Sequence, residues 1–412
     1  MTLPVPTITL FLDLPFSGGD FFTLNDPVKG LLDSATYLLA GDVGTDVTSY
    51  GFDINIQRGR TSELDQTGPG TGSLTFRNHD RDLDPLNTSG PFFGFLKPGP
   101  RCEIEIYGQR IFTSFVDDWF LEYTVTGDAS ASVPLTDGLG LMARQSFDAW
   151  TTTAGQLAGA RLHDILNRPE VSWPGGARDI DTGVATLQGD NVSWSSQPLN
   201  YEQLVALSDG GVVHVDRNGV FVFRDRHNLV NPTPIVTFAD DGSGIGFHGA
   251  AFDGGGVRFF NRVSIDRLSG TLQTVTDPDL GAADAIRALD RSELLMDSDE
   301  QSLQMAHYLL SLYKQPVTRV SQIVIKVHTL DPTDQALVAS LDLQDVVHVG
   351  PWTPQGLGST IDADMSIEGI QHAITLEEHL LFLSLAPIAQ SLAFTLDDAT
   401  LGKLDGVALL AY

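Results

Sequence analysis

The sequence predicts a mainly β protein that carries a small α+β insert. Three observations lead to this fold class. Residues 50–145 alternate apolar and polar side chains with the period of two that half-buried strands show. Residues 155–230 carry helical patterns and a strong hairpin signal. Residues 235–390 return to strand patterns around one long helix.

The first β region is regular. In GFDINIQ, Phe52, Ile54 and Ile56 alternate with polar residues, and RCEIEIYG repeats the pattern from Cys102 onward. The segments SLTFRN and IFTSFVDDWFLEYTVTG continue it, and GPGTG and KPGP separate the strands as turns. We therefore expect a β barrel or sandwich here.

The middle region changes character. AGARLHDILNRP has one apolar face and stops at Pro169, which predicts a short amphipathic helix. A second helix is expected from an N-cap at Asn200 through YEQLVALSD to Gly210. Alternating runs on both sides of Asn218-Gly219 predict a β-hairpin, so this region should pack helices on a hairpin.

The last third returns to strands. The stretch 298–314 predicts a long helix whose apolar stripe holds Leu303, His307 and Leu310, so His307 is expected to be a core residue. Strands are expected in VSQIVIKVHTL, LQDVVHVG, MSIEGIQHAITL and HLLFLSLAP. The chain then divides into an N-terminal arm (1–48), a first β domain (49–150), an α+β inserted domain (151–234), a second β domain with one long helix (235–390) and a C-terminal tail (391–412).

Charge and cysteine content limit the function classes. The chain has 53 Asp plus Glu against 24 Lys plus Arg, a net charge of −29, which disfavours binding to nucleic-acid phosphates. Cys102 is the only cysteine, so one chain can form no disulfide framework, zinc cluster or CxxC pair. The N-terminal stretch lacks a basic region and carries prolines, so we expect neither a signal peptide nor a membrane-spanning helix there.

The sequence offers no convincing catalytic, cofactor or metal residues. Gly244–Gly249 matches GxGxxG, but a strand pattern follows where a dinucleotide site needs a helix, so a loop is expected. In the acidic stretch Asn78–Pro85, an EF-hand that begins at Asp80 would have Pro85 and Pro91 where it needs Gly and Glu, which favours a charged turn. Asp117 and Asp118 point to opposite faces of a strand and form a poor catalytic pair. HExxH, GxSxG and P-loop motifs do not occur.

The most distinctive stretch is INIQRGRTSELDQTGPGTGSLTFRNHDRDLDP. It leads from a strand through a basic turn and an acidic segment to a second strand and an acidic turn. This stretch resembles the opening β domain of minor tail proteins, also called baseplate tail hub proteins, of long-tailed siphovirus phages of actinobacteria. The matching positions are Arg58-Gly59-Arg60, Glu63-Leu64-Asp65, Asn78, Asp80, Arg81 and Asp84-Pro85. Leu83 stands where an aromatic residue is more usual, which concerns local packing.

Two later regions are similar to the same family. RLHDIL, YEQLVALSDGG and GVFVFRDR follow one another as in the inserted domain of phage baseplate hub proteins. The stretch from LQDVVHV to HLLFLSLAP resembles the second tube domain of such hubs, with Ile367-Glu368-Gly369-Ile370 and His372 at the matching strand. The resemblance covers roughly residues 50–390.

The resemblance implies a structural virion protein rather than an enzyme, with two barrel-like tube domains in each chain. Three chains would present six such domains and join a six-fold tail tube to a three-fold tip. The implied partners are two further copies in a homotrimer, the distal tail protein, the tape measure protein and other tail-tip proteins. DNA would pass through the enclosed channel without specific binding. No cofactor and no membrane insertion is implied, and the expected location is the phage tail tip, after assembly in the host cytoplasm.

Alternatives remain open at this point. One is a distal tail protein, which forms a hexameric ring above the hub. Another is a tip adhesin or a glycan-degrading enzyme. For a hub, an acidic channel wall would repel phosphates, so we expect channel-facing positions to be enriched in Asp and Glu.

Two sets of residues are candidate assembly contacts. Arg58, Arg60 and Arg81 are minority charges in an acidic chain, and their planar guanidinium groups suit carboxylates either of a neighbouring subunit or of their own domain. The motif FTLND in the N-terminal arm returns as FTLDD in the C-terminal tail. These copies, with Phe22, Leu24, Phe394 and Leu396, are expected either to dock in equivalent grooves of a neighbouring ring or tip protein or to cap their own domain.

Overall fold

The computed structural model describes residues 6–12, 44–228, 232–281, 285–316, 319–353 and 360–388. Within these ranges fourteen strands form one large sheet in the order β17-β21-β24-β23-β3-β4-β8-β6-β5-β1-β2, with β22 and β16 attached at β23 and β7 at β8. Its strands are β1 (Thr7–Phe11), β2 (Thr45–Asp46), β3 (Gly51–Gly59), β4 (Thr71–Arg77), β5 (Arg101–Ile106), β6 (Gln109–Val116), β7 (Phe120–Tyr123), β8 (Ala129–Thr136), β16 (Val236–Phe238), β17 (Gly249–Asp253), β21 (Arg319–Lys326), β22 (Val346–Trp352), β23 (Ile361–Thr375) and β24 (His379–Pro387).

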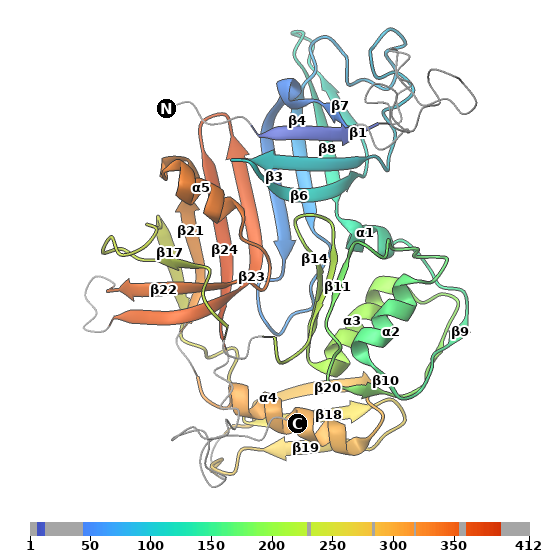
Figure 1. Cartoon of the computed structure of the whole chain (residues 1–412), viewed down its shortest axis with the longest axis vertical. Helices are drawn as coiled ribbons and strands as arrows, with labels where there is room; N and C mark the ends of the chain where they lie inside the picture. The colour runs from blue at the N-terminus through green and yellow to red at the C-terminus, as the bar shows by residue number, and fades with distance from the viewer. Residues whose placement is uncertain are drawn as a thin grey trace, which may run out of the picture.

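The large sheet has two halves that are far apart in the sequence. Strands β1–β8 form the N-terminal half, and β16, β17 and β21–β24 form the C-terminal half. The halves join where β3 pairs antiparallel with β23, from Gly59 opposite Gly369 to Asp53 opposite Thr375. Figure 1 shows this seam, with blue β3 beside red-orange β23.

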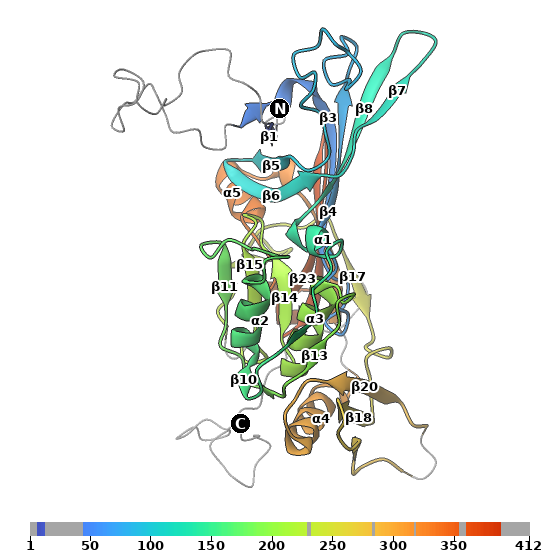
Figure 2. The same ribbon diagram turned by 90° about the vertical axis from the view of Figure 1, so that its right-hand side faces the viewer.

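One face of the large sheet is covered. Over the N-terminal half, β1, β5 and β6 enclose a core that includes Ile54, Ile56 and Leu74. Over the C-terminal half, the 3-10 helix η2 (Val327–Thr329), helix α5 (Pro332–Ala339) and β22 contribute side chains to a second core. Tyr107 packs against both cores, and Figure 2 shows β5, β6 and α5 on the same side of β3 and β4. The burial of Ile54 and Ile56 confirms the alternation predicted for β3.

The expected fold class, mainly β with a small α+β insert, is confirmed. The sheet is open rather than barrel-shaped: in the described part of the chain its order ends at β17 on one side and β2 on the other, and no pairing closes it. No helix in the described ranges is long and apolar enough to span a membrane.

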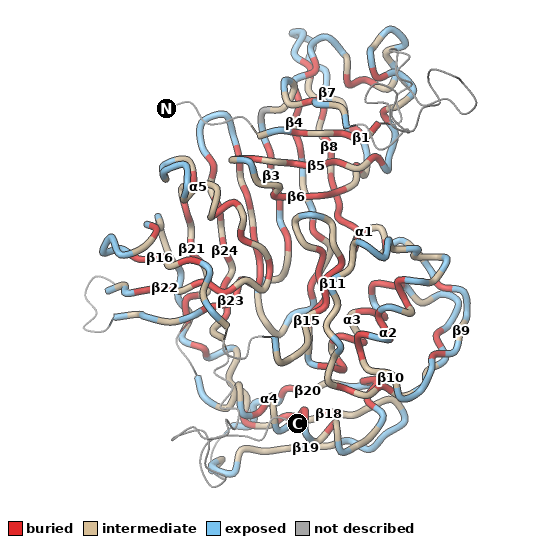
Figure 3. The backbone as a smooth tube through the Cα atoms, in the orientation of Figure 1, coloured by how far each residue is buried: buried red, intermediate tan, exposed pale blue. Residues whose placement is uncertain are grey.

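The insert packs helices on a small sheet. Its elements are α1 (Gly138–Met142), β9 (Trp150–Thr151), β10 (Gln156–Leu157), α2 (Ala158–Leu166), β11 (Arg178–Ile180), β12 (Thr186–Leu187), β13 (Asn191–Val192), α3 (Pro198–Asp209), β14 (Val212–Val215) and β15 (Phe221–Arg224). Figure 3 shows buried residues on α2, on α3 and along the strands beside them. The predicted short helix and the hairpin around Asn218-Gly219 are confirmed.

Two details of the insert differ from the sequence prediction. Helix α3 begins at Pro198 with Gln197 as N-cap, not at Asn200, because proline suits the first turn of a helix, where its missing N–H costs nothing. Its C-cap Gly210 has φ 78°, as the glycine predicted. The four residues of β14 are all buried, so the predicted alternation is wrong there. The loop of the hairpin contacts β6 of the large sheet, where the Thr113 hydroxyl donates to the carbonyl of Arg217 at 2.9 Å.

A third body, here called the α4 unit, consists of β18 (Arg262–Arg267), β19 (Gln273–Thr276), β20 (Ala288–Leu294) and α4 (Asp299–Tyr313). The predicted long helix is confirmed, with Ser298 as its N-cap. The predicted stripe is correct at Leu310 only. The buried positions are Ser302, Met305, Ala306 and Leu310, while Leu303 is half-buried and His307 is exposed. The helix turns this side to β18 and β19, which leaves His307 outside the core.

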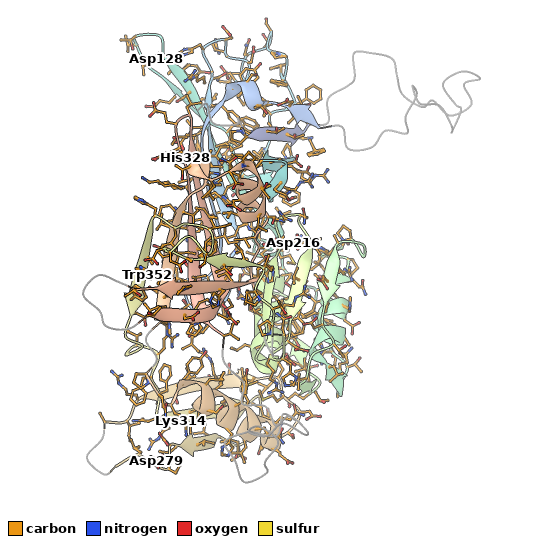
Figure 4. The ribbon with its side chains drawn as sticks, turned by 60° about the vertical axis from the view of Figure 1, so that its left-hand side comes forward. Asp128, Asp216, Asp279, Lys314, His328 and Trp352 are labelled. Carbon is orange, nitrogen blue, oxygen red and sulfur yellow. The ribbon has the colours of Figure 1, made fainter. Side chains whose placement is uncertain are left out.

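The insert contacts both of the other bodies. Backbone hydrogen bonds donated by Asp297 N and Gln188 N, at 3.0 and 2.8 Å, join β12 of the insert to the residues that follow β20. Figure 4 shows Asp216 of the hairpin loop beside the large sheet and Lys314, at the end of α4, below it.

Candidate functional site: the junction segment and the open sheet face

The patterns that suggested chemistry have structural roles. Gly244–Gly249 is a loop that leads into strand β17, as predicted. The stretch Asn78–Pro85 is a turn held by its own side chains, since Asn78 accepts from Leu83 N at 2.9 Å and Asp84 from Leu86 N at 2.8 Å. In the described ranges, no group of three or more His, Cys, Asp or Glu residues could hold a metal ion.

The junction segment, residues 58–67, leads from the end of β3 towards β4 and contacts all three bodies. It is the RGRTSELDQT part of the distinctive sequence motif. Its contacts run to the C-terminal half of the sheet, to the insert and to the α4 unit.

Arg58 is the most buried charge of the segment. It is 4% exposed and forms an ion pair with Asp342, which lies in the loop before β22. The second oxygen of Asp342 accepts the backbone N–H of Arg217, in the β14–β15 loop, at 2.8 Å. A single ion pair therefore ties the N-terminal half of the sheet to the C-terminal half and to the insert.

Asp137 lies next to this ion pair, where the chain leaves β8 and enters the insert. Its carboxylate accepts the N–H groups of Gly70 at 2.8 Å and Gly140 at 3.2 Å, and it caps α1. Burial raises the pKa of Asp137 to about 7, against the opposing effects of those hydrogen bonds and of the Arg58 charge. Asp137 thus fixes the start of the insert close to the ion pair that joins the two halves of the sheet.

Arg60 brings together the two motifs on which the family resemblance rests. Its Nε lies 2.6 Å from Oε2 of Glu368, the glutamate of Ile367-Glu368-Gly369 on β23. Glu368 is buried and also accepts the Ser366 hydroxyl at 2.7 Å and the Gln344 amide at 3.2 Å. The basic turn after β3 is therefore the partner of the acid in the last third of the chain.

Glu63 continues the network towards the edge of the sheet. It pairs with Arg319 at the start of β21, and Arg258 Nε lies 3.5 Å from its other oxygen. Arg258 also pairs with Asp253, at the end of β17, at 2.9 Å. The segment thus fixes the position of the edge strand β17.

The remaining contacts use backbone carbonyls. Leu64 O accepts Arg291 Nη2 of the α4 unit at 3.0 Å, and the Leu64 side chain packs on the apolar cluster of that unit. Thr67 O accepts the Gln203 amide of α3 at 2.7 Å. These contacts make the junction segment a brace that connects the three bodies.

Arg81 lies apart from this brace. It has φ 59° in the turn after β4 and pairs with Asp84 at 2.6 Å, and the Tyr123 hydroxyl of β7 donates to the same carboxylate at 2.7 Å. All three predicted arginines therefore have carboxylate partners inside their own chain. Contact with another chain stays a prediction, and Phe22, Leu24, Phe394 and Leu396 lie outside the described residues.

The open face of the large sheet is the second candidate functional feature. It carries the residues that alternate with the buried positions of each strand. Because opposed residues of antiparallel strands share a face, the registers align them in rows. One row is Phe382, Gln371, Gln57 and Thr71, and the next is Leu380, Ala373, Asn55, Ser73 and Pro134. These two rows hold no charged residue, although 19% of the chain is charged.

Charges stand only at the margins of these two rows. Lys326 is opposite Leu380 at the β21 end, Asp53 is on β3 one row further along, and Arg77 is at the end of β4. The face is thus a broad surface of amides, hydroxyls and a few apolar groups. Such a surface offers phosphates neither a strong attraction nor a strong repulsion at short range.

Glu202 of α3 is a buried acid without a partner in the described structure. It is fully buried, and neither carboxylate oxygen has a hydrogen-bond partner. Burial raises its pKa well above the usual value. A raised pKa in the folded state means that the folded chain holds its proton more tightly, so stability falls as pH rises from the unfolded pKa through the folded one.

We expect Glu202→Gln to stabilise the protein at pH 8 by about 1–3 kcal/mol, because the amide has no charge to desolvate. The gain should shrink towards pH 4.5, where the wild-type carboxyl is protonated in the folded chain and about half protonated in the unfolded one. Urea unfolding at both pH values measures this, with the exposed Glu122→Gln as control. Equal gains at both pH values would contradict the assigned protonation.

Comparison with known proteins gives matches at the level of structure. No protein-family model matches the sequence, and no curated protein matches it. A tail protein of 43 kDa from prophage MuSo2 of Shewanella oneidensis is similar with a TM-score of 0.58 and 17% identity, over 93% of this chain and 99% of that one. The tail protein from Neisseria meningitidis MC58 is similar with a TM-score of 0.60 and 13% identity, over 93% of this chain and 98% of that one.

The chain has the fold of these tail proteins. Both matches run over nearly the full length of both partners, so the likeness includes the large sheet, the insert and the α4 unit together. At these identities the likeness concerns the fold, and function needs a separate argument.

Proposed function

We propose that the chain is a structural protein of a phage tail: the tail hub, or minor tail protein, at the distal end of a siphovirus tail of an actinobacteriophage. The observation that supports this best is the fold shared almost end to end with two tail proteins. The distinctive sequence motif forms the brace that connects the three bodies of this fold. A rigid connection of this kind suits a protein that serves as a structural part of an assembly. The proposed role is not enzymatic.

A ring of three copies accounts for the open sheet. An unpaired sheet edge exposes backbone N–H and C=O groups, and natural proteins cover or pair such edges. In a cyclic assembly the β17 edge of one copy can face the β2 edge of the next, which closes the ring without any edge left over. With two sheet halves in each chain, three copies present six halves and can join a six-fold tube to a three-fold tip.

In this ring we place the open sheet face on the channel. The uncharged rows of β3, β4, β23 and β24 then form the wall, so passing DNA finds no cation to hold its phosphates. This differs from the acidic wall expected from composition, because the carboxylates stand outside these rows. The net charge of −29 then belongs mainly to the remaining surface.

The proposed partners are two further copies of the chain, the distal tail protein, the tape measure protein and tip proteins. Arg81, with its side chain 52% exposed, is a better candidate contact to another chain than Arg58 or Arg60, whose side chains are 3% and 13% exposed. The proposed location is the virion tail tip, after assembly in the host cytoplasm.

The test is the number and place of copies of this chain in an electron-microscopy map of the intact particle. We expect three copies around the channel at the distal end of the tail. A ring of six copies would instead indicate the distal tail protein, and density only on outer fibres would indicate an adhesin.

A further inference from the structure

A pocket of about 470 Å³ opens where the three bodies meet, beside the junction segment. Its volume is in the range of pockets that hold small ligands or a few side chains. One wall is apolar and comes from Leu207 of α3 and from Met305 and Leu309 of α4. Methionine is adaptable in shape, which suits a wall that receives side chains from elsewhere.

The pocket also contains two arginines that form no ion pair within 4.0 Å in the described residues, although Asp209 attracts Arg226 and Asp65 attracts Arg291 over a longer distance. Arg226 has a buried Nε without a hydrogen-bond partner, and its Nη1 lies 3.9 Å from Met305 Sδ. Arg291 bonds to the Leu64 carbonyl only, and burial lowers its pKa. Neither guanidinium group has a carboxylate at ion-pair distance to compensate for its partial removal from water.

The carboxylates of the pocket are already engaged. Glu368 binds Arg60, and Glu63 binds Arg319 and Arg258. Asp65 accepts the Thr61 hydroxyl at 3.4 Å, and Asp225 accepts the His227 N–H at 2.9 Å. The pocket therefore combines an apolar wall with open donor capacity on Arg226 and Arg291, which suits a short peptide with apolar side chains followed by acids.

We propose that this pocket binds the segment Phe394–Asp398 of the same chain. The C-terminal part of the chain starts at the pocket, since Ala386 and Pro387 line it. Five residues lie between Ile388 and Phe394, and the six Cα–Cα steps can span about 20 Å when extended. The Phe-Thr-Leu-Asp-Asp sequence supplies two apolar side chains for the α3–α4 wall and two carboxylates for Arg226 and Arg291.

The position of the pocket favours the C-terminal copy of the motif over the N-terminal one. The N-terminal copy, Phe22–Asp26, follows β1, which lies at the opposite end of the molecule from α4 in Figure 1. This inference does not depend on the proposed tail function, because it concerns a contact within one chain. In this proposal, the C-terminal tail of the chain adds a further connection between the large sheet and the α4 unit.

The experiment measures binding of a fluorescent peptide with the sequence SLAFTLDDA, residues 391–399, to the full-length chain. Phe394→Ala with Leu396→Ala vacates the pocket without changing its walls. We expect the double variant to bind the peptide at least about tenfold more tightly than wild type, whose own tail competes. Arg226→Glu added to the double variant should weaken binding by at least about tenfold.

Two controls keep the result interpretable. Arg287→Glu, at an arginine just before β20 that does not line the pocket, should leave peptide binding unchanged. If Arg226→Glu fails to fold, Met305→Trp, which fills the pocket, should block binding in its place.

Three outcomes overturn the proposal. Equal peptide affinity of wild type and the double variant would show that the tail does not occupy the pocket. Tighter binding of an FTLND peptide, residues 20–28, would assign the pocket to the N-terminal arm. If the affinity of the wild type for the peptide increases when the protein is diluted, the tail binds in a neighbouring copy.

Discussion

Replacement of Arg58 by alanine is expected to destabilise the chain by about 3–5 kcal/mol, the usual result of leaving one member of a buried ion pair alone. The variant removes the close ion-pair partner of the Asp342 carboxylate, which then keeps the Arg217 N–H and the more distant Arg217 Nε at 4.0 Å. It also removes a favourable charge from beside the buried Asp137. The loss should appear as a lower urea midpoint and as earlier proteolysis at the boundary between insert and sheet.

Two variants separate the ion pair from a general sensitivity to arginine loss. Arg144→Ala removes the more exposed pair with Asp117 and should cost no more than about 1 kcal/mol. Arg58→Met combined with Asp342→Asn removes both charges but keeps an acceptor for Arg217, so most of the stability should return. If the combined variant is as unstable as Arg58→Ala, shape rather than charge dominates this site.

Arginine at Gln57 and Gln371 is expected to block infection without blocking assembly. These two residues are opposite each other on β3 and β23, in the middle of the uncharged face. A trimer would then present six new guanidinium groups to the channel, and each can hold a phosphate of the passing DNA. In a phage that carries this chain, we expect normal particle numbers and a fall in plaque-forming fraction of at least about tenfold.

The same residue types provide the controls for the channel assignment. Gln57→Glu with Gln371→Glu should remain close to wild type, since carboxylates do not bind phosphates. Gln304→Arg adds the same cation at an exposed position of α4, away from the sheet face, and should also remain infectious. Full infectivity of the Gln57→Arg, Gln371→Arg phage would place this face outside the DNA path.

Local patterns in the sequence predicted many of the elements, because alternation and capping depend on neighbouring residues. Ile54 and Ile56 alternate with polar residues and are buried as expected, and the hairpin forms around Asn218-Gly219. His307 was placed wrongly because the choice of helix face depends on β18 and β19, which lie elsewhere in the sequence. The N-cap preference of Asn200 did not set the start of α3, because the helix begins two residues earlier at Pro198.

The junction could be predicted only in part. The motif around Arg58 and Arg60 is conspicuous in the sequence, but Asp342 and Glu368 lie 284 and 308 residues further along the chain. No periodicity or spacing links residues at that distance, so only the pairing of β3 with β23 shows that they meet. The neutral sheet face was also hidden, because the acid excess of the whole chain says nothing about one face.

An electron-microscopy map of the complete particle tests the central proposal most directly. The account predicts three copies of this chain at the distal end of the tail, with Gln57, Gln371 and Asn55 facing the central channel. A map with this chain in a different symmetry, or with the same residues facing away from the channel, would contradict it.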